Sequence, residues 1–232
     1  MRGDQKAMAG AGVLTLLFHM TPGLNLLGLP FIYLSTHAHE LFHAAAAVLT
    51  GGSAHYIKVF ANGSGVTPVT GGFLPVIASA GYVGSALLGG ALIYFGRTAQ
   101  GARAALAWMC AILAVSLVFW VRGDLVGVLS ALFWIALLAY VVRYWRSAAV
   151  ILAAQFVGLQ LCLYGLQAFF VLLRITAYTG LHNDAKLMER ATLLPAVFWA
   201  TAWALFSIVM MGLTLRRAWR EPAPRGKNVL FE

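Results

Sequence analysis

Charged residues are scarce in this chain: they make up 10% of its 232 residues, against 61% hydrophobic residues. Soluble domains have about 25% charged residues, so an ordinary soluble enzyme and a disordered chain are both excluded. Cysteine is also rare, and its two copies, Cys110 and Cys162, lie within apolar stretches. This excludes a disulfide framework and a cysteine-based zinc site. The apolar residues fall in long blocks, as they do in membrane proteins.

Acidic residues are fewer than basic ones, 7 against 16, for a formal net charge of +9. The basic residues lie in loops and in the C-terminal tail, where anionic lipid headgroups and membrane orientation account for them. We therefore expect the lipid bilayer, and no nucleic acid, as a partner. The side that carries most of them is expected to be cytoplasmic. It comprises Arg97, Arg103, Arg143, Arg146 and the tail, whereas the other side has Lys58, Arg122, Arg174, Lys186 and Arg190.

The apolar stretches predict the membrane-spanning helices. They cover residues 8–20, 24–50, 72–95, 104–121, 125–142, 148–173 and 193–215. All but the first approach or exceed the roughly 20 residues that cross a bilayer. We expect an all-α polytopic membrane protein with six to seven transmembrane helices, the first, short helix being the doubtful one. Residues 1–220 are expected to form one membrane-embedded domain, and residues 221–232 a flexible basic tail.

The second apolar stretch contains the motif His39-Glu40-Leu41-Phe42-His43. On a helix, positions four apart lie about 40° apart on one face, so both imidazoles can reach one metal ion. Glu40 beside them is placed to act as a general base toward water. Ionisable side chains are costly at membrane depth and so indicate function, although hydrogen bonds to neighbouring helices are the alternative. His37 points about 140° away and is interpreted as a polar contact.

A catalytic zinc site needs a third protein ligand. Asp124 and Asp184 each open a helix on the membrane side to which the motif points, so topology alone leaves both candidates open. Asp124 follows Arg122 and Gly123, where an arginine partner or a helix cap explains it. Asp184 lies in a polar stretch, and it too can be a helix cap. Glu189 is interpreted as a partner of neighbouring basic residues.

The motif in its membrane helix resembles the site-2 protease family of intramembrane zinc metallopeptidases, and in particular its compact bacterial, peptidase M50B-like branch. Other segments are similar to that branch in the same order. These are Leu49-Thr50-Gly51-Gly52, Asn62-Gly63-Ser64-Gly65-Val66-Thr67, Ala80-Gly81-Tyr82-Val83-Gly84-Ser85, Asn183-Asp184-Ala185 and Leu194-Pro195. The resemblance covers most of the chain, and it implies that residues 1–220 form a metallopeptidase domain.

The resemblance implies Zn²⁺ held by His39, His43 and a distal aspartate, with Glu40 as general base, and it favours Asp184 over Asp124. It implies cleavage of transmembrane or membrane-anchored proteins, in regulated intramembrane proteolysis, by a multi-pass protein of the cell membrane in a bacterium. It also implies a zinc site nearer the cytosol, whereas the distribution of lysine and arginine places the motif on the opposite side of the membrane. Phe42 stands where the wider family usually has glycine, and the family's distal Leu-Asp-Gly is missing. The alternative is therefore a non-catalytic pseudoprotease, or a metal-binding or transport component.

The polar stretch over residues 53–71 predicts two short extended segments around a turn. An open strand edge there can pair with an unwound substrate. This assigns substrate binding to Asn62, Gly63, Ser64, Gly65 and Val66. The alternative is an ordinary connecting hairpin.

Overall fold

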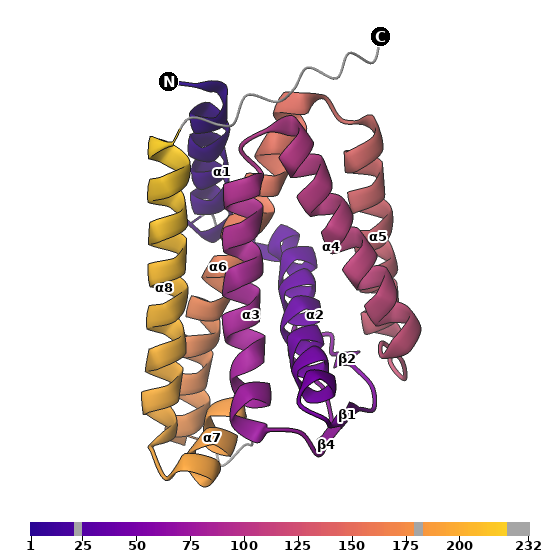
Figure 1. Cartoon of the computed structure of the whole chain (residues 1–232), viewed down its shortest axis with the longest axis vertical. Coiled ribbons are helices and arrows are strands. Elements are labelled where there is room, and N and C mark those ends of the chain that lie inside the picture. Colours follow the sequence, from indigo (N-terminus) through magenta and orange to yellow (C-terminus); the bar gives the residue numbers. More distant parts are fainter. Residues whose placement is uncertain (21–24, 179–182, 222–232) are drawn as a thin grey trace.

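The computed structural model describes residues 1–20, 25–178 and 183–221, without the side chains of residues 18–19, 25–27 and 165–178. Its helices are α1 (Gly3–Met20), α2 (Asn25–Leu49), α3 (Leu74–Phe95), α4 (Ala99–Phe119), α5 (Leu125–Tyr144), α6 (Ser147–Tyr178), α7 (Asp184–Thr192) and α8 (Ala196–Arg220) (Figure 1). Of the helices so described, α3, α4, α5, α6 and α8 are long and apolar enough to cross a membrane. The prediction of an all-α polytopic membrane protein is confirmed. The tail expected over residues 221–232 lies, beyond Glu221, outside the described residues.

Helix α2 does not reach the hydropathy of those five helices, although it has 25 residues. The imidazoles and the carboxylate of its motif lower its mean hydropathy. Their side chains avoid lipid, because His37, His39, Glu40 and His43 are all buried. Thus α2 lies inside the bundle, and its polar residues face other helices.

Helix α3 is the central helix, packed against α2, α6 and α8 (Figure 1). In the most apolar 18-residue stretch of α3, 61% is buried inside the bundle. The corresponding share is 28% in α4, α5 and α8, whose remaining apolar surface is free to face lipid. Glycines allow this close packing. A Cβ at Gly84 would overlap the ring of Phe42 on α2, and one at Gly89 would lie 2.7 Å from the carbonyl oxygen of Gly158 on α6. The small residues of α3 therefore set how closely α2 and α6 approach it.

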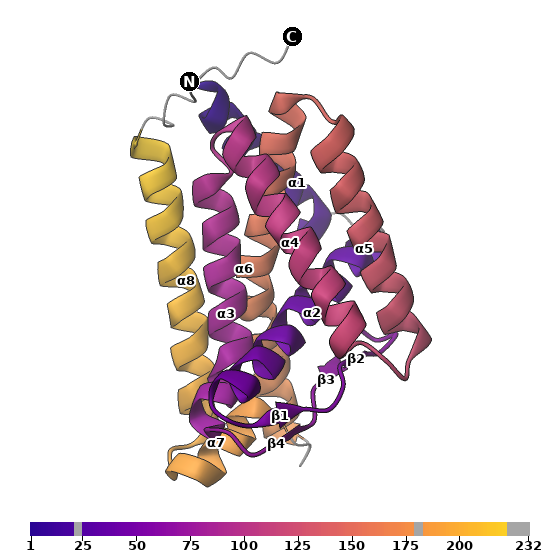
Figure 2. The ribbon, with the colours of Figure 1, turned by 45° about the vertical axis from the view of Figure 1, so that its right-hand side comes forward.

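The segment after α2 contains four two-residue strands: β1 (Ser53–Ala54), β2 (Lys58–Val59), β3 (Gly65–Val66) and β4 (Val69–Thr70). Strand β1 pairs with β4 and β2 with β3, both antiparallel, so the expected hairpin-like loop is confirmed. Both pairs lie below α2, β1–β4 near its C-terminal end and β2–β3 nearer its middle (Figure 2). A parallel bridge from Ile57 to Val121 attaches the loop to the connection between α4 and α5. The loop is thereby fixed at the same end of the molecule as the histidine motif.

The chain before the last span differs from the expectation that Asp184 opens that span. Asp184 begins a separate short helix, α7, whose C-terminal cap is Leu193 in the left-handed region (φ 62°). Pro195, which lacks a backbone N–H, then precedes α8. The Glu189 carboxylate accepts a hydrogen bond from the backbone N–H of Ala196 at 2.6 Å and fixes the junction. This break lets α7 lie across the end of the bundle (Figure 1).

Candidate metal centre

His39 and His43 of α2 and Asp184 of α7 converge on one point. The Nε2 atoms of the two histidines are 3.0 Å apart. Each lies 3.3 Å from Oδ2 of Asp184. The helical spacing of the motif thus gives the shared face that the sequence predicts, and α7 supplies the carboxylate. Among the described residues these three could hold a metal ion.

Neighbouring groups fix the two imidazole rings. Nδ1 of His43 lies 2.6 Å from the carbonyl oxygen of Ile77. Because a carbonyl only accepts, Nδ1 carries a proton, and Nε2 is the nitrogen that faces the cluster. The ring of His39 meets Tyr82 edge to face at 4.5 Å, and Tyr82 in turn stacks on Trp203 of α8 at 4.8 Å. Helices α3 and α8 therefore hold the motif histidines in place.

Gly81 makes room for both rings. A Cβ at this position would lie 2.5 Å from Cε1 of His39 and 2.6 Å from Nε2 of His43. Carbon atoms do not approach so closely without displacement of one partner. The backbone of α3 therefore forms one wall of the cluster, and only glycine fits there without moving the rings.

Asp184 lies in the first turn of α7, and Asn183 caps that helix by accepting a hydrogen bond from the Lys186 N–H at 2.9 Å. The Asp184 carboxylate is thus free to face α2. Burial opposes its ionisation, but His43 and His39 outweigh burial and hold the pKa of Asp184 below its usual range. Asp184 belongs to α7, outside the spanning helices, and remains an anion beside the two imidazoles.

Asp124 does not reach the cluster. Its side chain caps α5 by accepting from the backbone N–H of Gly127, and it also accepts from Val59 at 3.3 Å. The helix-cap explanation therefore holds for Asp124. Near it, Nε2 of His37 lies 2.9 Å from Oγ of Ser130 on α5, as expected for a polar contact between helices.

Glu40 is buried beside the cluster, within electrostatic reach of His39, His43 and Asp184. The hydroxyl of Thr67 donates a hydrogen bond to its Oε2 at 2.7 Å. This contact comes from the loop rather than from α2, so it holds the carboxylate in one direction. The sequence reasoning did not assign Thr67 a role, because the contact joins residues 27 positions apart.

If the site is the metallopeptidase centre that the sequence motifs imply, Thr67→Val lowers peptide cleavage about tenfold without loss of metal. The reason is that a hydrogen bond to a charged group contributes about 1.5–3 kcal/mol, and valine preserves shape but cannot donate. Initial rates on a transmembrane reporter peptide, with metal content measured on the same sample, check this. Thr67→Ser keeps the donor and should restore most of the rate; equal loss in both variants would contradict a positioning role for the hydroxyl.

Of the five residues assigned to substrate binding, Gly65 lies against Glu40, and the others differ in their surroundings. Asn62 and Ser64 form an exposed turn, with the Asn62 side chain accepting from Ser64 N–H at 3.0 Å. Gly63 and Gly65 press on α2: the carbonyl oxygen of Gly63 accepts from Thr36 at 2.7 Å, and a Cβ at Gly65 would lie 2.6 Å from Oε1 of Glu40. Val66 is 38% exposed. The loop therefore passes directly over the carboxylate.

Sequence reasoning also missed two tyrosines at the site. Tyr82 of α3 and Tyr164 of α6 lie within electrostatic reach of Glu40 and Asp184. The Tyr164 hydroxyl is 2.9 Å from Oγ1 of Thr36, one turn before Glu40 on α2. Tyr82 belongs to a segment quoted for its family resemblance, but nothing in its spacing indicates contact with His39.

The donor set fits zinc. Two imidazole nitrogens and one carboxylate oxygen are a common ligand set of catalytic zinc. Bonds of roughly 2.0–2.1 Å in a tetrahedron separate ligand atoms by about 3.3 Å. The observed separations of 3.0, 3.3 and 3.3 Å are close to that value. The buried Nδ1 of His39 has no hydrogen-bond partner among the described residues.

Apolar spanning helices around two histidines, an aspartate and a buried glutamate suggest an intramembrane metallopeptidase. The Peptidase M50B-like family matches residues 8–214, and the chain belongs to this family. The resemblance stated from the sequence motifs is thereby confirmed. No curated protein and no solved structure matches the chain.

Proposed function

We propose that this protein is a zinc metalloendopeptidase of the site-2 protease type, which hydrolyses peptide bonds of transmembrane or membrane-anchored proteins. One observation carries the proposal: His39, His43 and Asp184 converge within the apolar bundle, with Glu40 buried beside them. Membership of the Peptidase M50B-like family supports it. A role in regulated intramembrane proteolysis, in the cell membrane of a bacterium, is part of the same proposal.

In this proposal His39, His43 and Asp184 hold Zn²⁺. When bound, the ion supplies Lewis acidity toward the scissile carbonyl and makes water more acidic. His43 is oriented for this role by its bond to the Ile77 carbonyl, which leaves Nε2 free. Asp184 contributes a negative charge, which partly balances the ion's charge in a site of low polarity.

Glu40 acts as the general base in the proposed reaction. It accepts a proton from the attacking water and later delivers that proton to the leaving amine. Thr67 holds one carboxylate oxygen at 2.7 Å, which leaves the other available for proton transfer. Burial of Glu40 keeps bulk water from competing for this position.

The loop over Asn62–Val66 presents the substrate in this proposal. A helical peptide bond is shielded by its own helix, so a substrate segment must become extended before water attacks it. Strand β3 lies against Thr36 and Glu40, as the close approach of Gly65 requires. An extended peptide that pairs along this loop reaches the general base by the shortest route.

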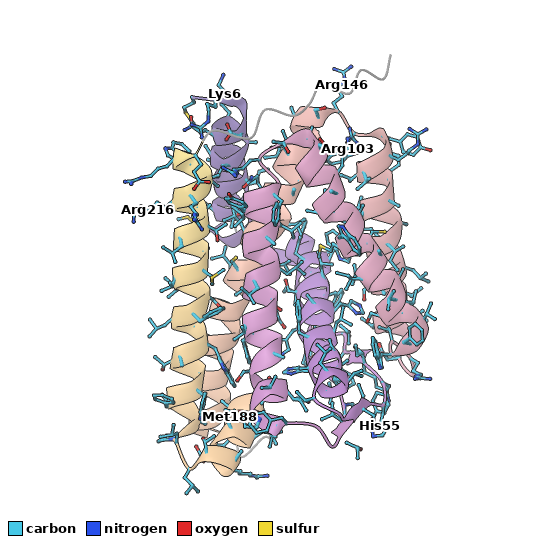
Figure 3. The ribbon with its side chains drawn as sticks, viewed as in Figure 1. Lys6, His55, Arg103, Arg146, Met188 and Arg216 are labelled. Carbon is cyan, nitrogen blue, oxygen red and sulfur yellow. The ribbon has the colours of Figure 1, made fainter. Side chains whose placement is uncertain are left out.

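We further propose that the end of the bundle bearing the site faces away from the cytoplasm. Lys6, Arg103, Arg146 and Arg216 lie toward the opposite end, whereas His55 lies at the site end (Figure 3). An excess of arginine and lysine marks the cytoplasmic side. This arrangement supports the orientation that the sequence count favours.

Metal content of variants tests the ligand set. We expect Asp184→Ala and His43→Ala to lower zinc affinity at least about 100-fold, because loss of a ligand exceeds the roughly tenfold to 100-fold cost of losing an outer partner. Asp124→Ala removes a cap worth about 1 kcal/mol of stability and should keep its zinc. Elemental analysis of detergent-purified protein, with thermal unfolding of each variant, checks this.

Two outcomes of that experiment would oppose the proposal. Zinc loss in Asp124→Ala alone would show that the third ligand is misassigned. Wild-type protein without stoichiometric metal would favour the non-catalytic alternative. Phe42, which motivated that alternative, packs its ring into the space at Gly84, whereas the histidine rings occupy the space at Gly81. Its bulk is therefore accommodated without displacing the predicted ligands.

A further inference from the structure

A second site lies at the opposite end of the bundle from the histidines. Helices α1 and α8 run in opposite directions there, and each packs against α6 (Figure 1). Between them is a cavity of about 410 Å³, whose apolar walls include Met8 and Gly12 of α1, Leu159 of α6, and Leu215 and Trp219 of α8. This volume is within the roughly 300–1,000 Å³ of ligand pockets. The proposed proteolytic reaction does not use this cavity.

Arg216 and Arg220 also line the cavity. They lie one turn apart on α8, are exposed, and have no carboxylate partner among the described residues. The described acidic residues at this end are engaged elsewhere: Asp4 pairs with Arg2 at 3.2 Å, and Glu221 pairs with Arg217 at 3.4 Å. The mouth of an apolar cavity therefore carries two uncompensated positive charges.

Hydrogen bonds join α1 to α8 next to the cavity. The Arg2 guanidinium donates to the backbone carbonyl of Trp219 at 2.8 Å and to that of Glu221 at 3.1 Å. The Gln5 side chain donates to the Trp219 carbonyl at 3.1 Å. These bonds tie the start of α1 to the end of α8, so a ligand enters a preformed site at low reorganisation cost.

We propose that this cavity binds an anionic phospholipid, with its phosphate at Arg216 and Arg220 and an acyl chain between α1, α6 and α8. Guanidinium groups bind phosphate oxygens in a bidentate fashion, and basic pockets between transmembrane helices bind anionic headgroups. A free phosphate leaves the apolar walls without a ligand, and a neutral lipid leaves the two arginines without a counter-charge. An anion that carries a hydrocarbon chain satisfies both parts of the site.

Native mass spectrometry of the full chain tests this with dioleoyl phosphatidylglycerol, dioleoyl phosphatidylcholine and glycerol 3-phosphate as probes. We expect one retained phosphatidylglycerol, bound about tenfold more tightly than phosphatidylcholine. The double variant R216Q/R220Q should lose about tenfold in phosphatidylglycerol affinity. The control R143Q/R146Q makes the same change of charge at the same end, outside the cavity, and should stay within about twofold of wild type.

A second variant tests the apolar part and leaves the arginines in place. A Cβ at Gly12 would meet no atom within 4 Å, so Gly12→Leu fits the fold and fills the cavity. It should lower phosphatidylglycerol binding about tenfold. Unchanged binding in Gly12→Leu, equal losses in the two arginine pairs, or equal retention of phosphatidylcholine would each overturn the proposal. Glycerol 3-phosphate bound as tightly as the lipid would overturn it in favour of a free phosphate site.

Discussion

Replacing Glu40 by glutamine is expected to lower cleavage of a transmembrane reporter peptide by about 10²–10⁴-fold, the usual contribution of a general base. Glutamine has nearly the same shape and can still contact Thr67, but it cannot accept a proton from water. His39, His43 and Asp184 are untouched, so zinc content should stay at the wild-type level. Initial rates and zinc content measured on the same preparation separate loss of the base from loss of the site.

A matched control for this variant is Glu221→Gln. It makes the same chemical change at the other end of the molecule, where Glu221 pairs with Arg97 at 3.8 Å and with Arg217 at 3.4 Å. Its cleavage rate should remain within about twofold of wild type, because the Glu221 side chain is 43% exposed and lies at the opposite end of the bundle from the histidines. Cleavage by Glu40→Gln at the control rate would show that another group acts as the base.

The pairing of His39 with His43 could be predicted from the sequence because it depends only on the geometry of one helix. Choosing between Asp124 and Asp184 needed more. Both residues begin helices at the same end of the bundle, and the local sequence around each is compatible with a helix N-cap. The choice depends on Asn183, which caps α7 in place of Asp184 and so frees that carboxylate. Before the fold was known, the polar stretch around Asp184 favoured it slightly, and the family resemblance favoured it further.

The surroundings of the site could not be predicted, because they depend on contacts between distant segments. Thr67 reaches Glu40 across a hairpin, and Trp203 acts on His39 only through Tyr82. The helix ends predicted from hydropathy were also imprecise. Hydropathy places the first helix at residue 8, whereas α1 starts at Gly3 with Asp4 in its first turn. An acidic residue in the first turn is favourable at a helix N-terminus. Hydropathy does not detect such a turn, because its residues are polar.

The glycine at position 81 is expected to affect zinc binding as strongly as an outer partner of a ligand does. Gly81→Ala should weaken zinc binding about tenfold to 100-fold and lower cleavage in parallel. A Cβ 2.5 Å from His39 and 2.6 Å from His43 must push at least one ring away, and functional sites tolerate only about 0.5 Å of displacement. Zinc titration monitored by elemental analysis, together with cleavage rates at saturating zinc, checks both effects.

Gly212→Ala on α8 is the matched control, since a Cβ there meets no atom within 4 Å. Alanine raises helix propensity by about 0.8–1 kcal/mol at either position, so a general effect on helix stability would appear in both variants. Zinc loss confined to Gly81→Ala therefore measures the displacement of the histidine rings. Wild-type zinc affinity in Gly81→Ala would mean that α3 does not pack against the rings, and the metal centre would then have to lie elsewhere on α2.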